Sequence, residues 1–138
     1  MPRIKWTESY SVNNAEMDVQ HRNWIEIFNR LDYVMLNGKT SELTTETLQA
    51  IQAMLEYASY HFRQEEEYMK QINFPDIVAH KRLHTDFDDQ LYQYHQKIRK
   101  GKLILTSEII SMVKNWLVGH ILNEDQKYAS FSQSRIIA

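Results

Sequence analysis

An all-α fold, namely an up-down-up-down antiparallel four-helix bundle, is predicted by three features of this sequence. The 138 residues include 3 Gly and 2 Pro, too few for the many turns of a β-sandwich or barrel. Breakers at Asn37-Gly38, Asn73-Phe74-Pro75 and Gly101 divide the chain into long segments. Each segment carries apolar residues at helical spacing, which predicts amphipathic helices packed on one core.

The helices are expected to follow an irregular N-terminal arm of residues 1–17. They are predicted, in order, over residues 18–36, about 44–72, about 75–100 and about 107–130. Short connections between long helices favour antiparallel neighbours. A length near 140 residues is typical of one domain, so residues 1–138 are expected to form a single domain with the bundle at about residues 18–131.

Local signals at the predicted helix ends agree with this division. Gly38 and Gly101 stand where a glycine commonly follows the last helical residue. Pro75 suits the first turn of the third helix, because its missing N–H has no helical partner there. Thr106 and Ser107 are candidate caps for the fourth helix.

Composition excludes several classes of function. Sixteen basic and eighteen acidic side chains give a net charge of −2, so no overall field attracts nucleic acid or an anionic membrane. The absence of Cys excludes disulfides, iron–sulfur clusters, thiolate zinc sites and a cysteine nucleophile. No apolar run is long enough for a membrane span, and residues 1–10 lack the pattern of a signal peptide. The expected compartment is the cytoplasm, with no membrane insertion.

Histidine is the informative residue type, with six in the chain. Each predicted helix places at least one His on its apolar face, often with a carboxylate or second His four residues away. The set is His21, His61 with Glu65, His80 with His84, and His120 followed by Glu124 and Asp125. Residues four apart lie on one helix face. A single buried His is usually an ordinary hydrogen-bonded core residue, but this many buried imidazoles and carboxylates together indicate a metal site. The combination suits iron, and zinc or manganese less decisively.

The spacing around these residues resembles that of the hemerythrins, specifically the single-domain bacterial hemerythrins. The matching motifs are Trp6 in the arm, Asp18-x-Gln20-His21, His61-Phe62-x-x-Glu65-Glu66-x-x-Met69, Phe74-Pro75 before His80-x3-His84, Trp116-Leu117-x-x-His120-Ile121, and Asp125. They extend over nearly the whole chain, and no ligand position departs from the family pattern. The resemblance therefore implies a four-helix bundle around a non-haem diiron centre.

The resemblance also implies a ligand set. It assigns His80, His84 and His120 to one iron, His21 and His61 to the other, and Glu65 and Asp125 to both as bridges, beside an oxo or hydroxo bridge. This count leaves one open coordination position on the second iron, where dioxygen would bind as a ligand. Candidates for an apolar wall around that position are Leu117, Ile25, Met54, Trp24 and Trp116; ordinary core packing is the alternative interpretation for each.

Spacing and resemblance disagree about the last carboxylate. In a regular α-helix Glu124 lies about 40° from His120, whereas Asp125 lies about 140° away. Spacing alone selects Glu124, and the resemblance selects Asp125. The second choice requires a local widening of the fourth helix after His120, such as a π-bulge, which Gly119 could ease.

The function implied by the resemblance is reversible binding of dioxygen, for transport, storage or buffering, rather than enzymatic turnover. One alternative is an oxygen- or redox-sensing module. Another is a diiron enzyme, such as a peroxidase or oxidase or a protein that handles nitric oxide. The protein acceptor is unknown, and the mixed surface charge fits a monomer or a weak oligomer.

Four polar residues near these motifs are interpreted differently. His95 is expected at the edge of the core or on the surface, too far along its helix to share the metals. Glu66 leaves the apolar stripe and is expected in solvent. Asp88, four residues after His84, could support that histidine from outside. Tyr128, one turn after Asp125, is expected to approach the site.

Overall fold

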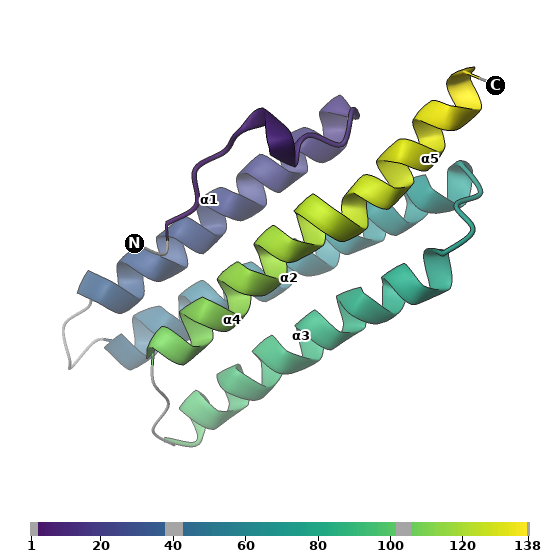
Figure 1. Cartoon of the computed structure of the whole chain (residues 1–138). Helices are drawn as coiled ribbons and strands as arrows, with labels where there is room; N and C mark the ends of the chain where they lie inside the picture. Colours follow the sequence, from purple (N-terminus) through teal and green to yellow (C-terminus); the bar gives the residue numbers. More distant parts are fainter. Residues whose placement is uncertain (1–2, 38–42, 102–105, 138) are drawn as a thin grey trace.

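The computed structural model describes residues 3–37, 43–101 and 106–137, and within them it contains helices and no strand. Its long helices are α1 (Ala15–Asn37), α2 (Leu43–Gln71), α3 (Ile77–Arg99), and a last helix made of α4 (Thr106–Gly119), a π-helical turn η2 (His120–Glu124) and α5 (Asp125–Ile137). Figure 1 shows them side by side as a bundle. The predicted all-α four-helix architecture is confirmed.

Helices that follow one another in the chain pack against each other. Helix α1 lies along α2, α2 lies along α3, and α4 contacts both α3 and α1. The core is formed by the apolar stripes of all the long helices, with Trp24, Phe28, Ile51, Phe87 and Val113 all completely buried. Burying a side chain of this size stabilises the fold by about 1.5–3 kcal/mol. The helices are thus held in fixed rotation about their axes, which decides which polar side chains face inward.

The N-terminal arm lies beside α1 (Figure 1), and side chains of that helix hold it. The side-chain amide of Asn29 binds the arm as both acceptor and donor. Its Oδ1 accepts from the N–H of Ile4 at 2.8 Å, and its Nδ2 donates to the carbonyl of Ile4 at 2.9 Å. Asp18 accepts from the Ser11 hydroxyl at 2.6 Å and from the Val12 N–H at 2.9 Å. A short 3-10 turn, η1 (Glu8–Tyr10), lies between these two attachments.

The helix ends differ from the prediction in small ways. The first helix begins at Ala15, three residues early, because Asn14 acts as its cap and accepts the Met17 N–H through Oδ1 at 3.2 Å. Pro75 lies before α3 and outside its first turn, in a connection where Asn73 has a φ of 56°.

The remaining end signals are partly confirmed. Gly101 directly follows the end of α3 with a φ of 77°, the left-handed conformation that a helix-ending glycine provides. Thr106 and Ser107 both lie within the first turn of α4. Gly38 lies outside the described residues.

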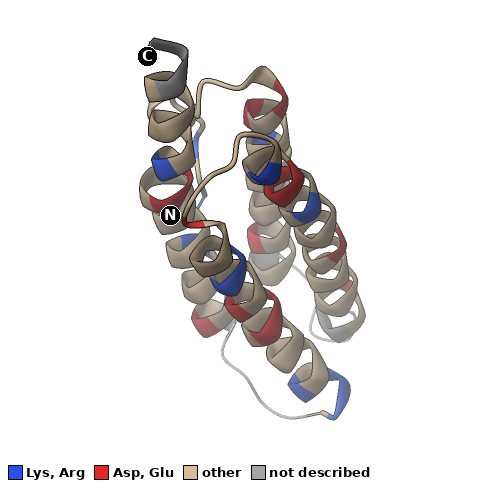
Figure 2. Cartoon of the chain, turned by 90° about the vertical axis from the view of Figure 1, so that its right-hand side faces the viewer, with Lys and Arg blue, Asp and Glu red and all other residues tan. Residues whose placement is uncertain are grey.

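Acidic and basic residues are interspersed along the helices in Figure 2, in keeping with the small net charge. No helix in the described part of the chain is both long and apolar enough to cross a membrane.

Candidate metal centre

All seven residues predicted as metal ligands meet in one buried cluster between the helices. They are His21 from α1, His61 and Glu65 from α2, His80 and His84 from α3, His120 from η2, and Asp125 at the start of α5. Each is at most 4% exposed. Burying this many polar groups without a partner that satisfies them together is costly.

Three imidazoles form one side of the cluster. The Nε2 atom of His120 lies 3.1 Å from Nε2 of His84 and 3.1 Å from Nε2 of His80. Oε1 of Glu65 is 3.1 Å from His84 Nε2 and 3.2 Å from His80 Nε2. Oδ1 of Asp125 is 3.0 Å from Nε2 of both His80 and His120. These five residues could hold one metal ion.

The other two imidazoles form the second side. Oε2 of Glu65 lies 3.2 Å from Nε2 of His21 and 3.3 Å from Nε2 of His61. Oδ2 of Asp125 lies 3.0 Å from His21 Nε2. These four residues form a second group that could hold a metal ion.

The two carboxylates connect the groups. Glu65 and Asp125 each turn one oxygen toward the three-imidazole side and the other toward the two-imidazole side. The cluster therefore contains two adjacent ligand sets that share both carboxylates, a geometry suited to a pair of bridged ions.

The spacing and the unsatisfied atoms both fit metal binding. Two donors bound to one ion at right angles through bonds of about 2.1 Å lie about 3.0 Å apart, close to the separations observed here. Among the described residues, Nε2 of His61 and both oxygens of Asp125 are buried without a hydrogen-bond partner. Leaving such atoms unsatisfied costs about 1–3 kcal/mol each, and a metal ion would remove that cost.

A π-helical turn brings Asp125 to the cluster. The N–H of Asp125 donates to the carbonyl of His120, a step of five residues where an α-helix takes four. This turn holds one more residue than an α-helical turn, so residues five apart come to share a face. The local widening that the choice of Asp125 requires is present.

Glu124, the alternative selected by spacing alone, lies outside the cluster. Its carboxylate accepts from Nζ of Lys127 at 3.0 Å, and its side chain is 31% exposed. Gly119 does not ease the widening through an unusual backbone, because its φ of −62° and ψ of −41° are ordinary helical values. An added Cβ there would meet nothing within 4 Å.

Side chains outside the cluster hold the far nitrogens of two of its histidines. The Nδ1 of His61 lies 2.8 Å from Oε1 of the buried Gln20, and the Nδ1 of His84 lies 2.7 Å from Oε2 of Glu66. Since both acceptors are oxygens, each Nδ1 carries the proton and leaves the Nε2 lone pair pointing into the cluster. Both imidazoles are therefore in the tautomer that binds a metal through Nε2.

The prediction that Glu66 stands in solvent is wrong. Its contact with His84 joins α2 to α3, and no spacing along one helix could reveal a contact between two helices. Glu66, and not Asp88, takes Nδ1 of His84, and Oδ1 of Asp88 has no hydrogen-bond partner among the described residues. Burial raises the pKa of Asp88 to about 6.

Aromatic rings complete the surroundings. The ring of Phe62 stacks on that of His84 with centroids 3.9 Å apart, and Trp116 stacks on His120 at 4.3 Å. The hydroxyl of Tyr128 donates to Oε2 of Glu65 at 2.9 Å, so the expected approach of Tyr128 to the site is confirmed. Phe62 and Gln20 belong to the motifs quoted above, but spacing alone attached no role to either.

The five candidates for an apolar wall all belong to the core around the cluster. Leu117, Ile25, Met54 and Trp24 are at most 1% exposed, and Trp116 is half-buried. The ring of Trp24 lies 5.2 Å from that of His61, and its Nε1 donates to Sδ of Met54 at 2.8 Å. Their packing is equally that of an ordinary core, so their role toward a ligand stays a prediction.

The close approach of carboxylates and imidazoles in the cluster shifts the pKa values of several of these side chains. Burial alone would raise the pKa of Glu65, yet the imidazoles of His61, His120 and His21 hold it well below its usual range. Burial lowers the pKa of His21, but the nearby carboxylates of Asp125, at 3.0 Å, and Glu65, at 3.2 Å, outweigh that effect and raise it to about 10. The same balance raises the pKa of His80 to about 9. Without metal, the two carboxylates thus favour protons on the neighbouring imidazoles.

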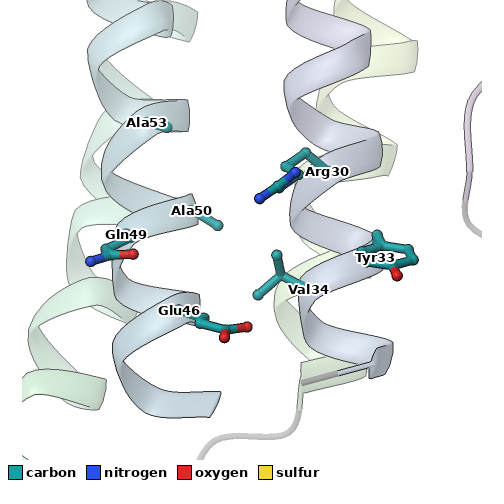
Figure 3. Close-up of a pocket in the computed structure, with 7 residues that line it drawn as sticks. All are labelled: Arg30, Tyr33, Val34, Glu46, Gln49, Ala50 and Ala53. Carbon is teal, nitrogen blue, oxygen red and sulfur yellow. The ribbon is translucent and has the colours of Figure 1, made fainter. Parts of the chain in front are cut away.

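Two other features lie apart from the cluster. A groove of about 510 Å³ between α1 and α2 is lined by Arg30, Tyr33, Val34, Glu46, Gln49, Ala50 and Ala53 (Figure 3), and it borders none of the predicted site residues. His95 is half-buried on α3 and belongs to neither ligand group, as expected.

Comparison with known proteins points to one family. The family model of the hemerythrin HHE cation binding domain matches residues 12–131. The chain is 31% identical over 129 residues to a bacteriohemerythrin from Stenotrophomonas maltophilia, covering 94% of this chain and 81% of that protein. It is 32% identical over 125 residues to a myohemerythrin from Theromyzon tessulatum, covering 90% and 89%.

The fold agrees with this relationship. A crystal structure of wild-type hemerythrin superimposes with a TM-score of 0.83 at 25% sequence identity, covering 92% of this chain and 95% of that chain. The same architecture is therefore retained although three quarters of the aligned residues differ.

Proposed function

Because the chain belongs to the hemerythrin family, we propose that it binds dioxygen reversibly at two iron ions held between its helices. The observation that carries this proposal is the pair of buried ligand groups, one with three imidazoles and one with two, that share Glu65 and Asp125. Imidazole combined with carboxylate suits iron.

The proposed ligand assignment follows the two groups. One iron would be held by His80, His84 and His120 and the other by His21 and His61, with Glu65 and Asp125 available to both. The first ion would then have five protein ligands and the second four. This inequality leaves room for an external ligand at the second ion, and we place dioxygen there.

When bound, an iron pair would supply redox-active ions able to bind dioxygen reversibly. The chain's own contribution is to hold the ligands rigidly and to keep water away. Leu117, Ile25, Met54 and Trp24 are buried in the core, the ring of Trp24 lies near that of His61, and Trp116 stacks on His120. An apolar wall of this kind disfavours entry of water, which would let the oxygen leave as peroxide and the protein remain oxidised and inactive.

Binding is favoured over substrate oxidation by the ligand chemistry. Imidazoles outnumber carboxylates five to two in the ligand groups, whereas ferritin-like oxidases use Glu-x-x-His pairs and a carboxylate-rich set. The hydroxyl of Tyr128 is already engaged with Glu65, so it is not placed to donate a proton to a substrate.

The test is to purify the protein, count iron per chain, reduce it without air and then admit dioxygen. We expect two irons per chain and an absorption band that appears with oxygen and disappears when oxygen is removed. A single irreversible oxidation would contradict the proposal and favour a redox sensor. Sustained consumption of oxygen or peroxide would contradict it in favour of an enzyme.

A further inference from the structure

Within the described part of the chain, two ligand histidines have a side-chain partner at Nδ1, and these partners differ in charge. His84, in the three-imidazole group, has its Nδ1–H on the carboxylate of Glu66 at 2.7 Å. His61, in the two-imidazole group, has its Nδ1–H on the amide oxygen of Gln20 at 2.8 Å. The geometry of the two contacts is nearly the same, and only the acceptor charge differs.

His84 is fixed on three sides. Its Nε2 faces the cluster, its Nδ1 faces Glu66, and its ring lies flat on Phe62 with an interplanar angle of 7°. Glu66 follows Glu65 directly on α2, so its carboxylate leaves the cluster while remaining beside α3. A hydrogen bond to a carboxylate is roughly twice as strong as one between neutral groups, and it moves electron density toward the opposite ring nitrogen.

His61 has a neutral environment at the corresponding atom. Gln20 is 4% exposed, and its backbone carbonyl accepts the hydroxyl of Tyr57 at 3.1 Å. Gln20 is therefore held in place without bringing a charge to His61. The amide orients the ring as well as a carboxylate would but adds less electron density to it.

From this contrast we propose that Glu66 is a positioning residue which makes His84 the strongest electron donor of the ligand set. This inference rests on the proposed diiron centre and deepens it. Glu66 would thereby favour the ferric state of the iron in the three-imidazole group. Gln20 brings no charge to His61, so the iron in the two-imidazole group, where dioxygen is placed, would be held by weaker electron donors and adapt more easily to a ligand. The two ligand groups thus differ both in their number of ligands and in the charge of the side chain behind one of their histidines.

The decisive variant is Glu66→Gln, because an amide oxygen can still accept the Nδ1–H while the charge is removed. We expect it to keep two irons per chain but to lose iron to a chelator about tenfold faster or more. We also expect a preference for ferric over ferrous iron that is about tenfold weaker, which corresponds to a reduction potential about 59 mV higher for one electron. Glu66→Asp should restore part of both losses.

Two further variants complete the design. Glu67→Gln removes the same charge from an exposed neighbour on α2 and should leave both iron release and potential unchanged. Gln20→Glu adds a charge at His61 and should lower the potential. A readout independent of iron is the NMR signal of the His84 Nδ1–H in the metal-free protein, which should move upfield in Glu66→Gln and stay in place in Glu67→Gln.

The outcomes separate this inference from the proposed function. If the unaltered protein binds no iron, the diiron proposal fails, and the NMR signal alone still tests the hydrogen bond from His84 to Glu66. If the protein binds two irons but Glu66→Gln matches Glu67→Gln in potential and iron release, the diiron proposal stands and the role given to Glu66 is wrong.

Discussion

The hydroxyl of Tyr128 donates a 2.9 Å hydrogen bond to Oε2 of Glu65, and both residues are completely buried. This oxygen is the one that faces His21 and His61. Tyr128 therefore fixes the carboxylate on the two-imidazole side of the cluster, from a position three residues after Asp125. The contact joins α5 to α2 and couples both shared carboxylates to one short stretch of helix.

Replacing Tyr128 by Phe should test the strength of this contact. The ring packing, including that against Tyr68 at 5.7 Å, is retained while the donor to a charged oxygen is lost. We expect the free energy of unfolding of the metal-free protein to fall by about 1.5–3 kcal/mol, measured by urea titration. Tyr68→Phe is the control, since its hydroxyl bonds the neutral, part-buried Ser132 and should cost about 1 kcal/mol or less. Equal losses would show that the charge on Glu65 is unimportant.

Alanine at Asp125 and at Glu124 should have opposite consequences for metal binding. Asp125 presents an oxygen to each ligand group, whereas Glu124 pairs with Lys127 outside the cluster. We expect Asp125→Ala to abolish assembly of the iron pair and Glu124→Ala to retain it. Iron per chain, measured after reconstitution, decides between them. The reverse result would mean that Glu124 is the bridging carboxylate.

Gly119→Ala should be tolerated in spite of its place beside the π-helical turn. The residue has ordinary helical angles, and the space that an alanine Cβ would occupy is open. Because Gly is less favourable than Ala inside a helix by about 1 kcal/mol, we expect the variant to be more stable by up to about that amount, with unchanged iron content. Thermal unfolding gives the first quantity. A loss of both stability and iron would instead mean that the turn depends on glycine.

The metal-free protein should lose stability as the solution becomes alkaline. The pKa of His21 is raised to about 10 and that of His80 to about 9, above the value of 6.5 for a free imidazole. A raised folded-state pKa contributes stability that is fully present below pH 6.5 and is lost as the pH rises through the folded value. The urea concentration at the unfolding midpoint should therefore decrease as the pH is raised from about 6.5 to about 10. The iron-loaded protein should show no such fall, because metal replaces those protons, and a flat profile without metal would contradict the assignment.

Leu117→Ala should affect both the core and the proposed ligand pocket. Leu117 is completely buried one turn before His120, and removing it leaves a cavity that costs about 2–5 kcal/mol. If the cavity admits water, the oxygen-bound form should also decay faster to the oxidised form, followed by absorbance. Val113→Ala, about one turn farther from His120 on α4, is the control for a smaller cavity in the same core. Equal decay in both variants would remove Leu117 from the proposed wall.

Much of the ligand set could be predicted from spacing because it depends on local helix geometry. Glu65 follows His61 by four residues, and His84 follows His80 by four, so a regular helix must place each pair on one face. The same rule selected Glu124 over Asp125, since it presumes an unbroken α-helix. The family resemblance selected Asp125 instead, and the π-helical turn is the physical reason that Asp125 faces the cluster.

By itself, the sequence determined the all-α class, the order of the helices and the inward-facing imidazoles, because periodicity and helix breakers act over a few residues. Only the tertiary structure decided which side chains from different helices meet. Glu66 binds His84 across 18 residues, Gln20 binds His61 across 41, and Tyr128 binds Glu65 across 63. Such contacts depend on the rotation of each helix about its axis, which is set when all the apolar faces pack together.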